Sequence, residues 1–86
     1  MKQLPELNNI QEFLLEYFRQ QGKEVEIKQD LFGCGALDSI GVFELIPSIE
    51  EYLNFNFTQE SLRIENFRSI DSISKTIFNS GTTKKL

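Results

Sequence analysis

The segment that decides the fold reads DSIGVFELIPSIEEYL, residues 38–53. At 100° per residue its apolar side chains fall within a narrow arc, a pattern typical of a helix that packs one face on a core. We therefore predict a helix from Asp38 and Ser39 to about residue 53, with a core face made of Val42, Leu45, Ile46, Ile49 and Leu53.

Pro47 lies about two turns inside this helix, too far along to be a first-turn proline. A proline there removes the hydrogen bond to the carbonyl of Phe43 and typically costs ~3 kcal/mol. The segment is therefore either one kinked helix or two shorter ones. Because the core arc continues through Ile49 and Leu53 without a change of phase, we expect a kink.

Helices are also predicted on both sides of this segment, from apolar residues at three- and four-residue spacing and from capping residues. The predicted helices are 5–21, with Pro5 in its first turn and Gly22 as its end; a short one over 59–64, capped by Thr58; and 70–79, capped by Ser69. Together with residues 38–53 they predict an all-α fold, a small four-helix bundle of three longer helices and one short helix.

The connector before residue 38 is predicted to lack a strand. Residues 23–28 alternate charged and apolar side chains, but a single strand would have nothing to pair with, so we expect an extended loop. Asp30, Leu31 and Phe32 predict a tight turn, and residues 33–35 a flexible hinge. We expect one domain over 1–80 and a flexible tail over 81–86.

Composition excludes much of enzyme chemistry. The 86-residue chain of 10.0 kDa has no His and a single Cys, Cys34. It therefore has no Ser-His or Cys-His nucleophile pair, no His-bearing zinc site and no internal disulfide. We expect no metal and no catalysis, and Cys34 to be an inert loop side chain. A free thiol, no signal-like start and no apolar run of about 20 residues predict a cytoplasmic protein without a membrane span.

The charge is concentrated in one part of the chain. The net charge is −4, yet residues 29–62 carry six acidic side chains and no Lys or Arg. This acidic segment argues against nucleic-acid binding, which needs a basic surface. Two interpretations stay open: an ordinary solvated helix face, or a docking surface for basic partners.

Ser39 is the candidate functional residue, because it lies where a loop meets a helix N-terminus. Free backbone N–H groups and the positive end of the helix dipole favour a phosphate there. A phosphodiester on Ser39 Oγ would be held without any basic side chain. The structural alternative is an ordinary Ser or Asp helix cap.

At these residues the sequence resembles the acyl carrier protein family. The resemblance extends from the first helix to about Phe78. It rests on four features: Leu31-Phe32-Gly33; the run Leu37-Asp38-Ser39-Ile40; the acidic helix with Glu44-Leu45 and Glu50-Glu51; and the stretch from Asn66 to Ile73 that leads into the last helix. Within this family, the order Leu37-Asp38-Ser39 most resembles that of free-standing D-alanyl, aminoacyl or specialised carriers.

The resemblance implies a function. Ser39 would receive a 4′-phosphopantetheine arm from coenzyme A through a phosphopantetheinyl transferase, which Asp38 would help to engage. The arm would carry an acyl or aminoacyl thioester from a loading ligase to downstream transferases or synthases of lipid or secondary-metabolite biosynthesis. The protein itself, expected to be a monomer, would catalyse nothing. The alternative is an unmodified helical interaction module that kept the shape and lost the arm.

A docking face is predicted on the same helix. Phe43 and Pro47 follow Ser39 by one and two turns, so the three share a stripe on the flank of the core arc. The predicted docking residues are Ile40, Phe43, Glu44, Pro47, Glu50 and Glu51. The alternatives are that Phe43 is a peripheral core residue and that the glutamates serve solubility. Gly41, at a position often acidic in fatty-acid carriers, and the interior proline argue against fatty-acid synthase partners.

Overall fold

The computed structural model describes residues 7–80 of the chain. Its elements are α1 (Leu7–Arg19), α2 (Ser39–Leu53), the 3₁₀ turns η1 (Gln59–Ser61) and η2 (Ile64–Phe67), and α3 (Ile70–Ser80). Within 7–80 there is no strand, so the all-α prediction is confirmed for these residues. The predicted start at Pro5 and the predicted tail over 81–86 lie outside the described residues.

The prediction of a fourth helix is wrong. In place of a helix over 59–64, the chain forms two separate 3₁₀ turns. Thr58 caps η1 as predicted, its Oγ1 accepting the Ser61 N–H at 3.2 Å. Leu62 then leaves the helical conformation (φ −87°, ψ 66°). Because Leu62 and Ile64 are both exposed, this short segment has no apolar face whose burial would stabilise a longer helix.

Helix α1 ends two residues earlier than predicted, at Arg19 rather than Gln21. Gly22 adopts a left-handed conformation (φ 79°), as expected of a glycine cap. The N–H of Lys23 bonds back to the Phe18 carbonyl at 2.9 Å, and the N–H of Gly22 bonds to the Arg19 carbonyl at 2.9 Å. These bonds reverse the chain direction and start the connector that leads to α2.

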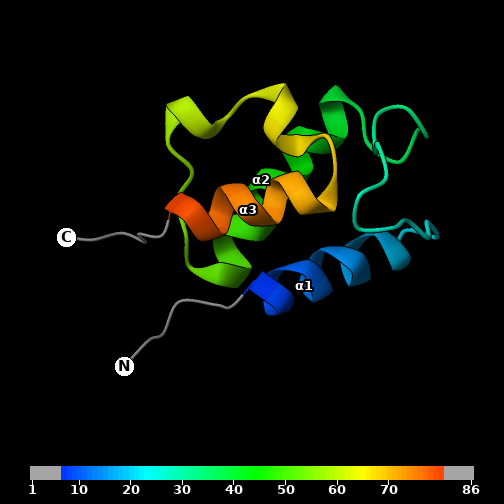
Figure 1. Ribbon diagram of the computed structural model, residues 1–86, viewed down its shortest axis with the longest axis horizontal. Coiled ribbons are helices and arrows are strands. Elements are labelled where there is room, and N and C mark those ends of the chain that lie inside the picture. Colours follow the sequence, from blue (N-terminus) through cyan, green and yellow to red (C-terminus); the bar gives the residue numbers. More distant parts are fainter. Residues whose placement is uncertain (1–6, 81–86) are drawn as a thin grey trace.

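The three helices and the connector enclose one core (Figure 1). Helix α3 packs along α1 and against η2. The core consists of Ile10, Leu14 and Phe18 of α1; Leu45 and Ile49 of α2; Ile70, Ile73 and Ile77 of α3; and Leu31, Ala36, Leu37, Phe55 and Phe67 of the connecting segments. The predicted core arc of α2 is confirmed, since Val42, Ile46 and Leu53 pack against this cluster as partly buried residues.

Helix α2 runs without a break from Ser39 to Leu53, so Pro47 does not divide it into two helices. Pro47 is exposed and lies away from the buried side chains Leu45 and Ile49. The missing N–H therefore affects the solvent side of the helix, where water can bond the freed carbonyl of Phe43. The kink at Pro47 stays a prediction.

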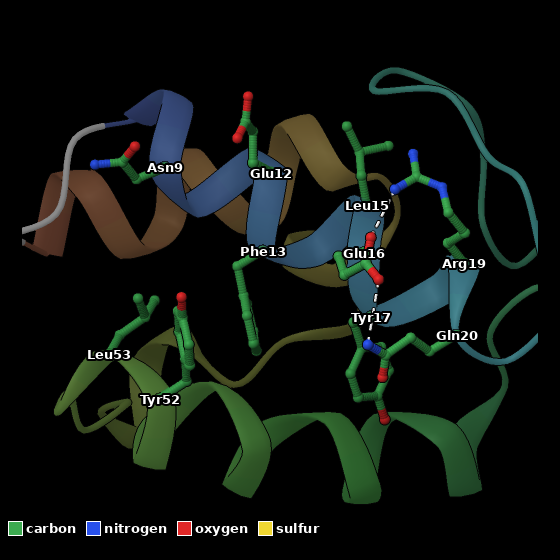
Figure 2. A pocket seen from close by; sticks show the side chains of 10 residues that line it. All are labelled: Asn9, Glu12, Phe13, Leu15, Glu16, Tyr17, Arg19, Gln20, Tyr52 and Leu53. Carbon is green, nitrogen blue, oxygen red and sulfur yellow. Dashed lines mark hydrogen bonds and ion pairs between the residues drawn. The ribbon is translucent and has the colours of Figure 1, made fainter.

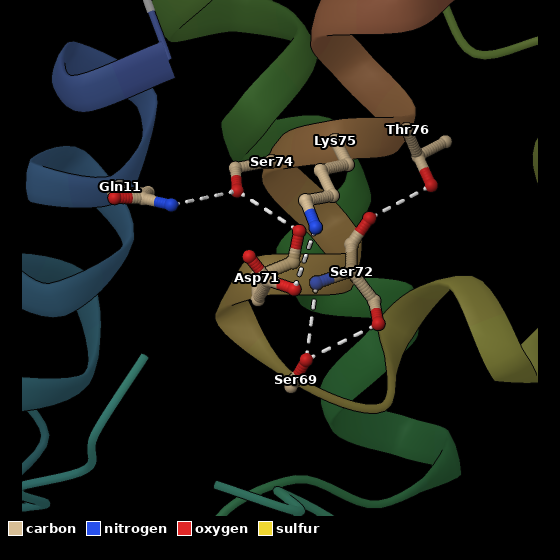
Figure 3. Close-up of polar contacts among 7 residues, drawn as sticks. All are labelled: Gln11, Ser69, Asp71, Ser72, Ser74, Lys75 and Thr76. Atoms are coloured by element: carbon tan, nitrogen blue, oxygen red, sulfur yellow. Dashed lines mark hydrogen bonds and ion pairs between the residues drawn. The ribbon is translucent and has the colours of Figure 1, made fainter. Parts of the chain in front are cut away.

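Polar side chains fix the start of α3 (Figure 3). Ser69 caps the helix as predicted, its Oγ accepting the Ser72 N–H at 3.0 Å. Ser74 is fully buried, and its hydroxyl donates to the Asp71 carbonyl at 3.1 Å and accepts from Gln11 Nε2 at 3.4 Å. The last bond links α3 to α1.

Two backbone hydrogen bonds join the connector to the start of α3. The Ile27 carbonyl accepts the Asp71 N–H at 2.8 Å, and the Leu31 N–H donates to the Arg68 carbonyl at 2.7 Å. The stretch over 23–28 is a loop, as predicted, with Val25 and Ile27 packed on the core. The connector thus reaches Ser39 from a fixed position beside α3.

Candidate functional site

The loop that precedes α2 is a series of hydrogen-bonded turns, and the flexibility predicted for residues 33–35 stays a prediction. Asp30 Oδ1 accepts the Gly33 N–H at 3.1 Å, and the Asp30 carbonyl accepts the Cys34 N–H at 3.0 Å. A Cβ at Gly33 would lie 2.7 Å from Asp30 Oδ2, so a larger residue there would displace the Asp30 carboxylate that accepts the Gly33 N–H. Leu31 and Leu37 are buried on either side and anchor the loop to the core. Ser39 therefore projects from a well-defined support.

Asp38 is the N-cap of α2. Its backbone is extended (φ −139°, ψ −174°), and its Oδ1 accepts the Gly41 N–H at 2.8 Å. Its carbonyl accepts the Val42 N–H at 2.9 Å, which begins the helical ladder. A cap of this kind typically stabilises a helix by ~1 kcal/mol.

Ser39 is the first residue of α2, and it is exposed. No described residue forms a hydrogen bond with its hydroxyl, in contrast to Ser48, Ser61, Ser69 and Ser74. Of the two residues in the alternative interpretation, Asp38 is the helix cap and Ser39 is not. Its hydroxyl is free of a structural task and can be reached from solvent.

One basic side chain lies near the start of α2, which the sequence reasoning missed. Lys23 is half-buried, and its Nζ donates to the Ala36 carbonyl at 3.2 Å. It lines a hollow of about 230 Å³ together with Tyr17, Asp38, Ile40 and Glu44, and Ser39 is not among the lining residues. Lys23 lies outside the acidic segment in sequence, and only the reversal at Gly22 brings it here.

The outward face of α2 combines apolar and acidic side chains. Ile40 is 69% exposed and Phe43 is 75% exposed, so Phe43 is not a peripheral core residue. Pro47, Glu44 and Glu51 are exposed as well. The structure thus places these five predicted docking residues in solvent on one helix.

Glu50 differs from the other predicted docking residues. It is half-buried, and its Oε2 accepts the Phe57 N–H at 3.0 Å. Its carbonyl accepts the N–H groups of Asn54 and Phe55, where Asn54 is left-handed (φ 54°). Glu50 therefore stabilises the turn after α2. The sequence pattern does not predict this contact.

The described residues offer few other chemical groups. Cys34 is exposed, and its Sγ lies 3.7 Å from the Leu31 carbonyl. Within 7–80 no three His, Cys, Asp or Glu side chains cluster in a way that could hold a metal ion. Of the helices described, none has both the length and the apolarity to cross a membrane.

A comparison with family models matches residues 8–77 to the phosphopantetheine attachment site family. The chain belongs to this family. The match begins at the second residue of α1, includes the connector and all of α2 with Asp38 and Ser39, and ends at Ile77 within α3. Neither curated proteins nor solved structures give a match.

Phosphopantetheine attachment domains carry 4′-phosphopantetheine as a covalent group and are carriers, not enzymes. They work with a phosphopantetheinyl transferase and with biosynthetic enzymes. The site described here fits such a group, since an exposed and unbonded hydroxyl stands at the positive end of a helix. When bound, the group supplies a thiol that forms thioesters.

Proposed function

We propose that Ser39 is the attachment residue and that the domain carries an acyl or aminoacyl thioester on a 4′-phosphopantetheine arm. The observation that carries this proposal is that Asp38 caps the start of α2, while the Ser39 hydroxyl beside it is exposed and bonds to no described residue. In loading, Ser39 Oγ forms a phosphodiester with the phosphopantetheine part of coenzyme A, and adenosine 3′,5′-bisphosphate leaves.

The chain's own groups suit the resulting phosphodiester. The first N–H groups of α2 have no carbonyl partner within the helix, and the helix dipole adds positive potential at this end. Asp38 already occupies the Gly41 N–H, so the N–H groups ahead of it remain for solvent or phosphate. Lys23 adds a positive charge to the hollow lined by Asp38 and Ile40, while Asp38 and Glu44 keep the surroundings acidic.

We propose that partner enzymes dock on the outward face of α2, defined by Ile40, Phe43, Glu44, Pro47 and Glu51. The exposed apolar side chains would enter a groove, and the carboxylates would meet basic residues on its rim. Glu50 is excluded from this face because its carboxylate already accepts the Phe57 N–H. Asp38 would serve the transferase in addition to capping α2.

We further propose the setting of this activity. The carrier works as a cytosolic monomer of one domain over 1–80, and a ligase that activates an acid or amino acid loads it. The single free cysteine suits a reducing compartment. Gly41 and the interior Pro47 set its docking helix apart and favour aminoacyl or specialised partners over fatty-acid synthase.

The experiment is intact-mass analysis after incubation with coenzyme A and a broad-specificity phosphopantetheinyl transferase. We expect the mass to rise by one phosphopantetheinyl group in the parent protein and in Ser48→Ala, a matched serine on the same helix, but not in Ser39→Ala. A gain that survives Ser39→Ala would move the site to another residue. No gain in any protein would favour the unmodified interaction module.

A further inference from the structure

A groove runs between α1 and α2 on the side away from α3 (Figure 2). Its volume is about 970 Å³, and its walls include Phe13, Glu16, Tyr17, Gln20, Tyr52 and Leu53. Figure 2 shows Phe13 and Tyr17 pointing from α1 toward α2, and Tyr52 pointing from α2 toward α1. The two helices are therefore joined on this side by aromatic side chains rather than by close backbone packing.

The aromatic side chains of the groove are only partly used by the fold. Phe13 and Tyr52 stack with ring centroids 4.2 Å apart and planes 10° apart, and Tyr17 lies 6.4 Å from Phe13. Tyr52 nevertheless stays 66% exposed, and Phe13 and Tyr17 are half-buried. Neither tyrosine hydroxyl forms a hydrogen bond with another described residue. The groove thus offers ring faces and two free hydroxyl groups.

One end of the groove lies near the start of α2. Tyr17 lines both the groove and the hollow that Asp38 and Ile40 help to form, so this side chain lies between the two spaces. Thirteen residues at 1.5 Å each place Tyr52 about 20 Å along α2 from Ser39. An extended phosphopantetheine chain, about fourteen bonds long, spans about 18 Å. An arm of this length, extended by the group on its thiol, could enter the groove from the end at Tyr17.

We propose that the α1–α2 groove receives the cargo of this carrier, and that the cargo has an aromatic ring: an aryl acyl or aromatic aminoacyl group. The inference rests on the proposed function, because Ser39 is the tether. An aromatic ring gains offset or edge-to-face contacts with Tyr17 and the Phe13–Tyr52 pair. An acetyl or alanyl group has no ring to place there.

The two tyrosines give the test a built-in probe. The chain has only two Tyr and no Trp, and both tyrosines line the groove. Tyr52 lines the groove alone, whereas Tyr17 also lines the hollow at the start of α2, so the emission change of the parent protein is compared with that of Tyr52→Ala. The protein is loaded from benzoyl-, octanoyl- and acetyl-coenzyme A, and intact mass checks the loading at Ser39. The first measured quantity is tyrosine emission. The second is the rate at which hydroxylamine cleaves the thioester, relative to the rate for the same thioester on free pantetheine.

We expect the benzoyl thioester to change tyrosine emission and to be cleaved about threefold more slowly than on free pantetheine, with no such protection for acetyl. Tyr52→Ala should remove the protection, and because Tyr52 is mostly exposed the variant should keep its fold, which circular dichroism checks. Phe78→Ala, an exposed aromatic of α3 outside both the groove and the docking face, is the matched control and should leave the protection intact.

Equal cleavage rates on protein and pantetheine, with unchanged tyrosine emission, would overturn the proposal that the groove binds the cargo. The proposed carrier function would not be affected. Protection of octanoyl equal to that of benzoyl would overturn the aromatic selection. If no protein can be loaded, S-benzoyl-N-acetylcysteamine is titrated into the unmodified protein and followed by NMR. Shifts confined to Phe13, Tyr17 and Tyr52 would then support the groove and reject the carrier function, and their absence would reject both.

Discussion

Helices α2 and α3 contrast in how they use their apolar side chains. In α3, Ile70, Ile73 and Ile77 are all buried, so folding accounts for them. In α2, Leu45 and Ile49 are buried, but Ile40 and Phe43 are exposed on another face.

The polar groups of the two helices differ in the same way. The hydroxyls of Ser69 and Ser74 in and before α3 are hydrogen-bonded, whereas that of Ser39 at the start of α2 bonds to no described residue. Phe78 of α3 is also exposed, at 52%, but α2 has one whole face and its first residue free. That unused part of α2 is what we assign to function.

The largest expected effect separates a core residue of α3 from an exposed residue of α2. Ile73→Ala should lower the free energy of unfolding by about 2–5 kcal/mol, because it leaves a cavity in the core. Phe43→Ala should change it by less than about 0.5 kcal/mol, because the ring is 75% exposed. Urea unfolding followed by circular dichroism measures both, and a comparable loss in the two variants would show that Phe43 is part of the core.

The second prediction separates two tasks of Asp38. Asp38→Ala should cost about 1 kcal/mol of stability through the lost cap on Gly41. Asp38→Asn should cost less than about 0.5 kcal/mol, because asparagine caps equally well, and should still slow loading by the transferase if the negative charge is needed there. Thermal unfolding and loading rates are compared in the two variants. Parent-like loading of Asp38→Asn would limit Asp38 to capping.

The third prediction concerns two neighbouring glutamates at the end of α2. Glu50→Ala should cost about 1 kcal/mol, because the Phe57 N–H loses its partner. Glu51→Ala, the matched control, should change stability by less than about 0.5 kcal/mol, because its side chain is exposed. Chemical unfolding of both variants is the measurement, and equal stabilities would show that the Glu50 bond contributes nothing.

The smallest effect on stability, but a clear effect on rate, is expected for charge reversal on the outward face of α2. Glu44→Lys with Glu51→Lys should slow loading at low salt, and the difference should shrink as salt screens the charges. Helical circular dichroism should not change.

The matched control reverses two exposed glutamates of the connector, Glu24→Lys with Glu26→Lys, which gives the same net charge. Equal loading rates for the two double variants at low salt would argue against docking on this face of α2.

The parts of the fold that the sequence predicted are those fixed by local pattern. Helix α2, its cap at Asp38 and the caps at Thr58 and Ser69 depend on residues within one turn of each other. The prediction of a fourth helix is wrong because the cap at Thr58 can start a helical turn but cannot extend it. Leu62 and Ile64 are exposed, so burial in the core does not stabilise further turns.

The parts of the site that could not be predicted depend on reversals of the chain. Lys23 reaches the Ala36 carbonyl only through the left-handed Gly22, and Glu50 meets Phe57 only through the left-handed Asn54. The groove joins residues of α1 with Tyr52, far apart in sequence. Helical periodicity says which side chains leave the core, but not which distant residue they meet.

The two backbone bonds between the connector and the start of α3 have a consequence for synthesis on the ribosome. Ile27 and Leu31 find their partners only at Asp71 and Arg68, about forty residues downstream. While the chain is still emerging, the turns before Ser39 lack these anchors, and closing so long a loop is unfavourable until core burial offsets its entropy. On the proposed function, a modifying enzyme would therefore meet Ser39 in its native position only after nearly the whole domain has left the exit tunnel.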